Sequence, residues 1–215
     1  MRRAAFAIAI AALTGAPRGA FGQFEANAFW PEVVAFVHYS PTYNVGGLMQ
    51  NRPEETATAT ERYAGIFADF LDLARWNLHT EYRYKWTEHD QEIIGHENRG
   101  IIEGTVHSQG GKASFVSRTG VDLRWLPLGF SGRIRQRVQG ERPVLIGKRK
   151  VTPFVSDEVY YDSRFGSIAR NVARLGAKTW LRDLGLEASY TRQDNYRLRL
   201  ERLNVLAITV AIVQR

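Results

Sequence analysis

Residues 76–86 read WNLHTEYRYKW, and their polarity alternates from one position to the next. One face would carry Trp76, Leu78, Thr80, Tyr82, Tyr84 and Trp86, and the other Asn77, His79, Glu81, Arg83 and Lys85. A period of two is the period of a β-strand, whereas a helix would scatter both classes around its circumference. The length also suits a membrane, because a tilted strand needs about 9 to 11 residues to cross a bilayer.

The same alternation recurs along the chain. It marks strands at 99–107, 115–125, 133–139, 170–178 and 184–191, and a last apolar strand at 205–213. Further strands are predicted near 28–38, 42–50, 61–71 and 149–161, which brings the count to eleven. Single-chain bacterial outer-membrane barrels have even strand numbers, so ten or twelve are expected. The predicted fold class is all-β, an antiparallel up-and-down transmembrane β-barrel.

Periodicity alone does not say which face lies inside the barrel. A soluble lipocalin-like ligand-binding barrel, with an apolar interior, would alternate in a similar way and is kept as an alternative. Long strands, a charged face rich in arginine and glutamate, and small residues on the apolar face favour lipid outside and a polar lumen. The charged side chains are then expected to line the lumen.

The N-terminus has the pattern of an export signal. Residues 1–3 are positively charged at Arg2 and Arg3, residues 4–13 are apolar, and Ala20-Phe21-Gly22 is a small-x-small cleavage site. We therefore expect a cleavable signal peptide over 1–22, a single barrel domain over 23–215 and a location in the outer membrane of a Gram-negative bacterium. The expected partners are outer-membrane lipids, lipopolysaccharide and the outer-membrane assembly machinery.

Composition excludes several classes. The chain has 215 residues, no cysteine and a net charge of +7, but its basic residues are interleaved with acids, which argues against nucleic-acid binding. No apolar run approaches the roughly 20 residues of a membrane-spanning helix. Tight connections at 71–75 and 181–185 alternate with long ones at 52–61, 87–97 and 191–203, as in a barrel with short turns on one rim.

Aromatic residues recur near the predicted strand ends, where rings at a membrane interface would explain their placement. The alternative is that they are core residues of a soluble sandwich, since aromatic residues favour strands in any protein. The aromatic residues near the strand ends are Phe29, Trp30, Tyr82 to Trp86, Trp125, Phe130, Tyr160, Tyr161, Trp180 and Tyr190.

Arginines and acids on the polar faces form the predicted site. The lumen-lining candidates are Arg83, Arg99, Glu103, Arg118, Asp122, Arg124, Arg133, Arg135, Arg137, Glu158, Arg170, Arg174 and Glu187. Their main interpretation is a salt-bridged filling that holds a narrow or closed barrel together, and the alternative is a narrow anion-preferring channel.

Other constellations carry weaker signals. His79 and His107 have Glu81, Glu103 and Ser117 nearby in the sequence. A serine, a histidine and an acid from this set would make a lipid-hydrolysing triad only if they met on neighbouring strands, and Ser117 falls on the apolar face. His89 and His96 flank acids in an expected loop, without the spacing of a zinc or calcium site. We predict no catalytic residue, no metal and no cofactor.

The polar strands also carry a family resemblance. Its residues are Phe29-Trp30, the set Arg118, Asp122 and Arg124, the set Arg133, Arg135 and Arg137, the run Ser156-Asp157-Glu158, then Arg170-Asn171 with Gly176, and 187–193. Together they resemble domain-of-unknown-function family 2490 over nearly the whole chain after the leader. The resemblance implies a secreted outer-membrane barrel and brings no catalytic residue.

Overall fold

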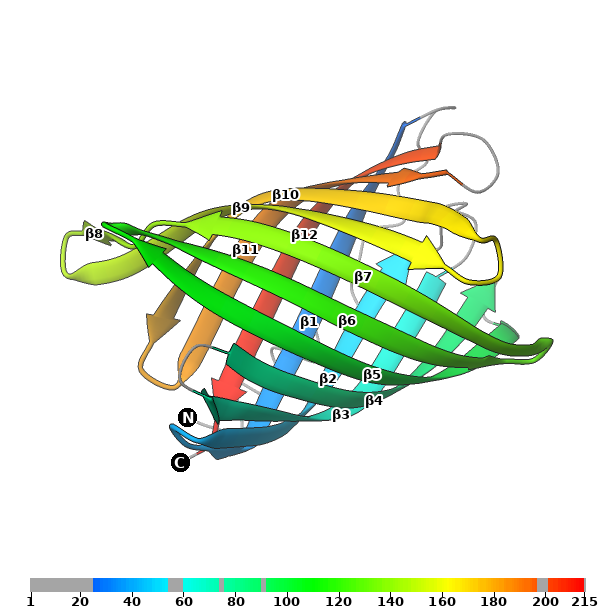
Figure 1. Ribbon diagram of the computed structural model, residues 1–215, viewed down its shortest axis with the longest axis horizontal. Coiled ribbons are helices and arrows are strands. Elements are labelled where there is room, and N and C mark those ends of the chain that lie inside the picture. The colour runs from blue at the N-terminus through cyan, green and yellow to red at the C-terminus, as the bar shows by residue number, and fades with distance from the viewer. Residues whose placement is uncertain (1–24, 54–59, 74–75, 90–91, 197–200, 215) are drawn as a thin grey trace.

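The computed structural model describes residues 25–53, 60–73, 76–89, 92–196 and 201–214, and regular structure in these ranges is all β-strand (Figure 1). The expected signal peptide, residues 1–22, lies outside them. Within the described ranges, no helix has the length and apolar character needed to cross a membrane.

Twelve strands follow one another along the chain. They are β1 (Glu25–Tyr39), β2 (Tyr43–Pro53), β3 (Thr60–Leu73), β4 (Trp76–His89), β5 (Glu92–Gly110), β6 (Ala113–Leu126), β7 (Gly129–Glu141), β8 (Val144–Ile146), β9 (Arg149–Asp162), β10 (Ser167–Leu181), β11 (Leu184–Asn195) and β12 (Glu201–Val213). All strands expected from the alternation are present, and most are longer than expected.

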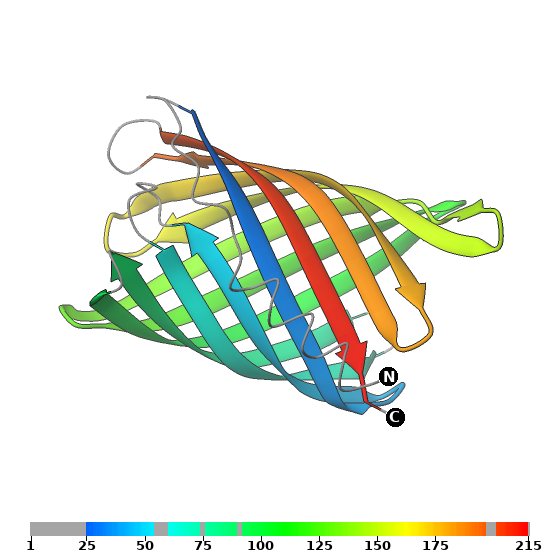
Figure 2. The same ribbon diagram turned by 180° about the vertical axis from the view of Figure 1, so that it is seen from behind.

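The strands close into a barrel of eleven, because β8 pairs only with β9 and extends that hairpin beyond the wall (Figures 1 and 2). Neighbouring strands are antiparallel except at the closure, where β1 pairs with β12 in parallel. The expected even number, and with it a wholly antiparallel wall, is therefore wrong. The physical reason is simple: an up-and-down chain with an odd number of strands ends in the direction in which it began.

The connection expected over 87–97 is largely strand. β4 continues to His89, β5 begins at Glu92, and Lys85 lies opposite Glu97 in register. Three of the acids that suggested a solvated loop, Glu88, Glu92 and Glu97, lie on these strands, and the register shifts between Thr87 and Glu88. The connection expected over 191–203 is shortened in the same way, because β11 runs to Asn195 and β12 begins at Glu201.

The barrel has two distinct rims. The β8 rim carries the β8–β9 hairpin and the connections at 40–42, 111–112 and 182–183, and the opposite rim carries those at 127–128 and 163–166. Glycine provides the positive φ at turns such as Gly111, with φ 64°, whereas Arg182 adopts φ 58° at the 182–183 turn. Short connections occur on both rims, for example 111–112 on the β8 rim and 127–128 on the opposite one. The strands joined by the two connections expected to be tight, 71–75 and 181–185, meet at the β8 rim.

The two faces of the wall have opposite polarity. Side chains that point inward include fully or nearly fully buried polar groups, such as Glu97 at 0%, Asp162 at 0% and Arg124 at 4% exposure. Side chains that point outward are exposed and apolar, such as Ile102 at 52% and Leu175 at 64%. A soluble barrel would show the reverse, because burying apolar surface is what stabilises it.

An apolar patch interrupts the polar interior at the closing strands. Trp30, Leu203 and Val205 are buried together there, with Ala28 and Ala207 packed against them. The buried charges are concentrated on β4 to β7 and β9, and this part of the wall positions the candidate site.

A candidate site of paired charges in the lumen

Strand register brings the predicted charges to one face. Residues opposite one another on neighbouring strands share a face of the sheet. Among the lumenal candidates, Arg83 lies opposite Arg99. Arg137 lies opposite Arg118 on one side and Glu158 on the other. The inward-pointing candidates are Arg83, Arg99, Glu103, Arg118, Asp122, Arg124, Arg133, Arg135, Arg137, Glu158, Arg170, Arg174 and Glu187.

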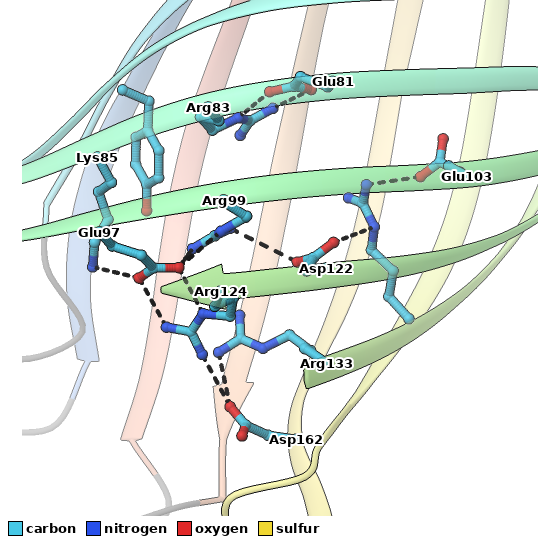
Figure 3. Close-up of polar contacts among 12 residues, drawn as sticks. Glu81, Arg83, Lys85, Glu97, Arg99, Glu103, Asp122, Arg124, Arg133 and Asp162 are labelled. Carbon is cyan, nitrogen blue, oxygen red and sulfur yellow. Dashed lines mark hydrogen bonds and ion pairs between the residues drawn. The ribbon is translucent and has the colours of Figure 1, made fainter. Parts of the chain in front are cut away.

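Glu97 on β5 is a buried carboxylate held by three basic side chains (Figure 3). Arg124 on β6 donates to it with two nitrogens, Nε to Oε1 at 2.6 Å and Nη2 to Oε2 at 2.9 Å. Arg99 lies 2.8 Å from Oε1 through Nη2, and Lys85 on β4 lies 3.5 Å from Oε2. A two-nitrogen arginine–carboxylate pair is among the strongest ionic contacts in proteins, so Glu97 ties three strands together.

Asp162 on β9 forms the second half of this cluster. Its Oδ2 lies 3.1 Å from Nη1 of Arg124 and 3.2 Å from Nη2 of Arg133. Ser131 donates its hydroxyl to Oδ1 at 3.3 Å, and the backbone N–H of Arg164 donates to the same oxygen at 3.1 Å. Arg124 therefore bridges two buried carboxylates that belong to strands on either side of β6 and β7.

A second cluster lies nearer the β8 rim and is centred on Arg135 of β7. Its Nη2 lies 3.0 Å from Glu103 on β5, and its Nε lies 3.4 Å from Asp122 on β6. A third carboxylate, Glu158 on β9, is 3.9 Å from Nη1. The same Asp122 lies 3.8 Å from Arg99, which connects the two clusters into one network.

Histidine extends the network at β3 and β4. His79 Nδ1 lies 2.6 Å from Asp69, its Nε2 lies 3.3 Å from Glu81, and Arg83 binds the other side of Glu81. Lys85 links the wall onward to Glu61 on β3 at 2.7 Å.

Three inward aromatic rings face arginines. The Arg52 guanidinium lies 4.6 Å from the ring centroid of Trp30 and 5.5 Å from that of Tyr63, and Tyr160 lies 5.7 Å from Arg133. Cations over aromatic faces are stabilised by the ring quadrupole. Trp30 and Tyr160 were expected at the outer interface, and this is wrong. Both are buried in the lumen, because residues two apart on a strand share a face. Trp30 thus shares the face of Ala28 on β1, and Tyr160 shares that of Glu158 on β9.

The residues proposed for a hydrolase triad lie apart. Ser117 is on the outer face, where its hydroxyl accepts from Gln136 Nε2 at 3.0 Å, while His79 is held by two acids inside. His107 bonds to Asn77 at 3.1 Å. Among the described residues, no group of histidines and acids is arranged to hold a metal. His89 and His96 are exposed strand residues, and Asp90 lies outside the described part of the chain.

Sequence reasoning overlooked Glu97 and Asp162, the two acids at the centre of the network. Both share the strand parity of a predicted lumenal position, Glu97 two residues from Arg99 and Asp162 four residues from Glu158. Strict parity along the strand would have found both.

Comparisons with known proteins agree with the architecture. A family model described as "Protein of unknown function (DUF2490)" matches residues 27–203. A search of curated proteins returns no match. Among solved structures, the chain is similar to LpxR from Salmonella typhimurium, an outer-membrane β-barrel, with a TM-score of 0.53 and 7% identity over 81% of this chain and 84% of that one. At that identity the likeness concerns the fold alone.

Proposed function

Since the chain belongs to the DUF2490 family of proteins of unknown function, we propose a role from its geometry: an integral outer-membrane barrel whose lumen is closed by an ion-paired network. The proposal includes removal of the leader over 1–22 during export. It assigns no catalytic residue to the lumen.

The outer surface supports insertion into a bilayer. Exposed aliphatic side chains occupy the middle of the wall, including Ile66, Ile102, Leu175 and Leu206. Outward aromatic side chains gather towards both ends, with Tyr43, Phe70, Trp76 and Phe115 near the β8 rim and Tyr84, Trp125, Phe130 and Tyr161 near the opposite rim. An apolar band between two aromatic girdles is typical of outer-membrane barrels. The likeness to LpxR points in the same direction.

One observation carries the closed lumen: Arg124 bonds Glu97 and Asp162 simultaneously, and both carboxylates are 0% exposed. A hydrated pore leaves its lining charges in contact with water, whereas these side chains satisfy one another. A wall of eleven strands also encloses much less space than the roughly 16 to 18 strands of open porins. The paired charges around Arg124 and Arg135 therefore act as internal cross-links between strands.

Membrane location and pore closure need separate experiments. Membranes from cells that express the full chain are washed with alkali or urea, and the protein is expected to stay in the outer-membrane pellet. Purified protein is then inserted into planar bilayers, where we expect no steady conductance. Large porin-like steps would contradict the closed lumen, and recovery in the soluble periplasmic fraction would contradict the membrane location.

The two alternatives give different results in the same preparation. A narrow anion channel predicts small anion-selective steps whose selectivity falls when Arg133, Arg135 and Arg137 are replaced by glutamine. A lipid hydrolase predicts release of fatty acid from phospholipid or lipopolysaccharide, abolished by His79→Ala in a barrel that still folds. Neither activity is expected from the paired geometry.

A further inference from the structure

We propose that Arg118, Arg137 and Arg174 form a binding site for a phosphate group inside the barrel, on the β8-rim side of the Arg124 cluster. The proposal goes beyond a closed, ion-paired lumen, because it assigns a ligand to arginines that the network leaves without enough carboxylate partners.

The three arginines lie on the lumenal face of three strands, and both Arg118 and Arg174 are close enough to Arg137 to repel its charge. Arg118 on β6 and Arg137 on β7 lie directly opposite each other in register. Arg137 is opposite Glu158 on β9, and Arg174 on β10 is opposite Ser156 on that same strand, two residues from Glu158. Like charges placed directly opposite on neighbouring strands destabilise a sheet. Such an arrangement is costly unless an anion neutralises it.

Local carboxylates neutralise the group only in part. Arg118 reaches Glu103 at 3.0 Å, but Glu103 also binds Arg135 at 3.0 Å. Within the described part of the chain, Arg137 and Arg174 have no carboxylate within ion-pair distance. Glu158 attracts Arg135, Arg137 and Arg174 electrostatically, yet its one close ion pair, at 3.9 Å, is with Arg135.

Two buried N–H donors without acceptors also indicate that an anion binds here. The Nε atoms of Arg137 and Arg174 are buried, and neither has a hydrogen-bond acceptor. A buried donor without an acceptor is unfavourable, and a guanidinium presents five donors in a fixed fork. The Arg118 side chain is 38% exposed, so solvent reaches the cluster from the lumen.

A phosphate group has the negative charge and the hydrogen-bond acceptors that these arginines lack. A phosphate monoester or inorganic phosphate carries up to two negative charges and at least three acceptor oxygens, and arginine binds this geometry with paired N–H donors. The phosphate could belong to a free anion or to a lipid headgroup that enters at the rim. Both sources offer the same group to the same side chains.

The test uses the purified, folded chain in zwitterionic detergent. Inorganic phosphate is titrated by calorimetry against a background of sodium chloride at constant ionic strength. We expect saturable binding, reduced about tenfold or more by Arg137→Gln and by Arg174→Gln, the loss that corresponds to one charge-assisted contact. Arg192→Gln is the matched control, because Arg192 is an exposed arginine on the outer face.

Thermal unfolding supplies a second readout. Without phosphate, Arg137→Gln should melt at the same temperature as the native chain or higher, since the substitution removes repulsion from Arg118. With phosphate, only the native chain and Arg192→Gln should gain melting temperature. A marked loss of stability in Arg137→Gln without phosphate would overturn the proposal, because it would identify the residue as a structural cross-link.

Two further arms separate the sources. Glycerol 3-phosphate tests a soluble monoester, and phosphatidylcholine nanodiscs with and without phosphatidic acid test a lipid headgroup. An Arg137-dependent response to either supports the site and identifies its source. If none of the three phosphate probes binds above the chloride background, or if Arg174→Gln binds them as tightly as the native chain, the proposal is refuted. Neither result depends on whether the barrel conducts ions.

Discussion

The Arg135 side chain lies flat across Gly120, its register partner on the neighbouring strand. A Cβ atom at Gly120 would come within 2.8 Å of Arg135 Nε and 3.2 Å of its Cγ. The absence of a side chain at this position lets Arg135 cross β6 and reach Glu103 on β5. A glycine that looks like a sheet defect is therefore part of the charge network.

Gly120→Ala is expected to destabilise the barrel. The added methyl group must displace Arg135 or shift the strand, and such overpacking typically costs about 1 to 3 kcal/mol. Gly104→Ala is the control, because no atom lies within 4 Å of a Cβ built at Gly104. Urea unfolding of both variants in lipid vesicles measures the difference. Equal stabilities would show that Arg135 does not depend on the space above Gly120.

Arg124→Gln should be among the most damaging single changes in the lumen. It leaves Glu97 and Asp162 buried with fewer positive partners, and breaking a buried ion pair costs about 3 to 5 kcal/mol. Adding Glu97→Gln should recover part of the loss, since it removes one uncompensated charge. Urea unfolding gives the midpoint of the native chain, of Arg124→Gln and of the double variant. The double variant is expected to unfold at a higher urea concentration than Arg124→Gln alone.

Arg164→Gln provides the comparison for that experiment. Arg164 contacts the same Asp162, at 3.5 Å, but its side chain is 34% exposed. Ion pairs in contact with water contribute roughly 0 to 1 kcal/mol, so the variant should unfold nearly as the native chain does. A similar loss of stability in Arg124→Gln and Arg164→Gln would mean that burial does not determine how much these ion pairs stabilise the barrel.

The alternation was sufficient to identify the strands of the barrel wall and most of the inward charges. A one-residue shift moves a strand's side chains to the other face, so parity along each strand assigns its residues once one charged position is known. Arg118, Asp122 and Arg124 follow this rule on β6, as do Arg133, Arg135 and Arg137 on β7. The polarity of the faces followed from strand length and from the type of charge.

The details that sequence reasoning missed depend on pairing between strands. The choice of Arg124 as the bridge between Glu97 and Asp162 depends on register across four strands, which no local pattern contains. Parity also breaks at bulges, such as the one between Ile168 and Arg170 on β10. The parallel closure is a property of the whole strand count.

Arginine at Ile102 should disrupt membrane folding. Ile102 is exposed in the middle of β5, and a charge facing the bilayer midplane costs about 2 to 4 kcal/mol. Leu145→Arg is the control, because Leu145 is exposed on β8, which lies outside the barrel wall. Folding yield and stability in lipid vesicles are measured for both variants, and only Ile102→Arg is expected to lose either. Full tolerance at Ile102 would favour a soluble barrel instead.

The parallel closure can be tested by cross-linking, because the chain contains no cysteine of its own. Glu32 on β1 and Thr209 on β12 lie opposite each other in register, with Thr209 Oγ1 and Glu32 Oε1 3.4 Å apart. Neighbouring strands are about 4.8 Å apart, within the roughly 4.4 to 6.8 Å between the Cα atoms of a disulfide, so cysteines at both positions should oxidise to one intramolecular bond. Val33→Cys with Thr209→Cys is the control, because a shift of one residue points the two side chains to opposite faces. Oxidised protein is compared by gel mobility and free-thiol titration, and cross-linking of the control pair alone, or of neither pair, would contradict both the closure and its register.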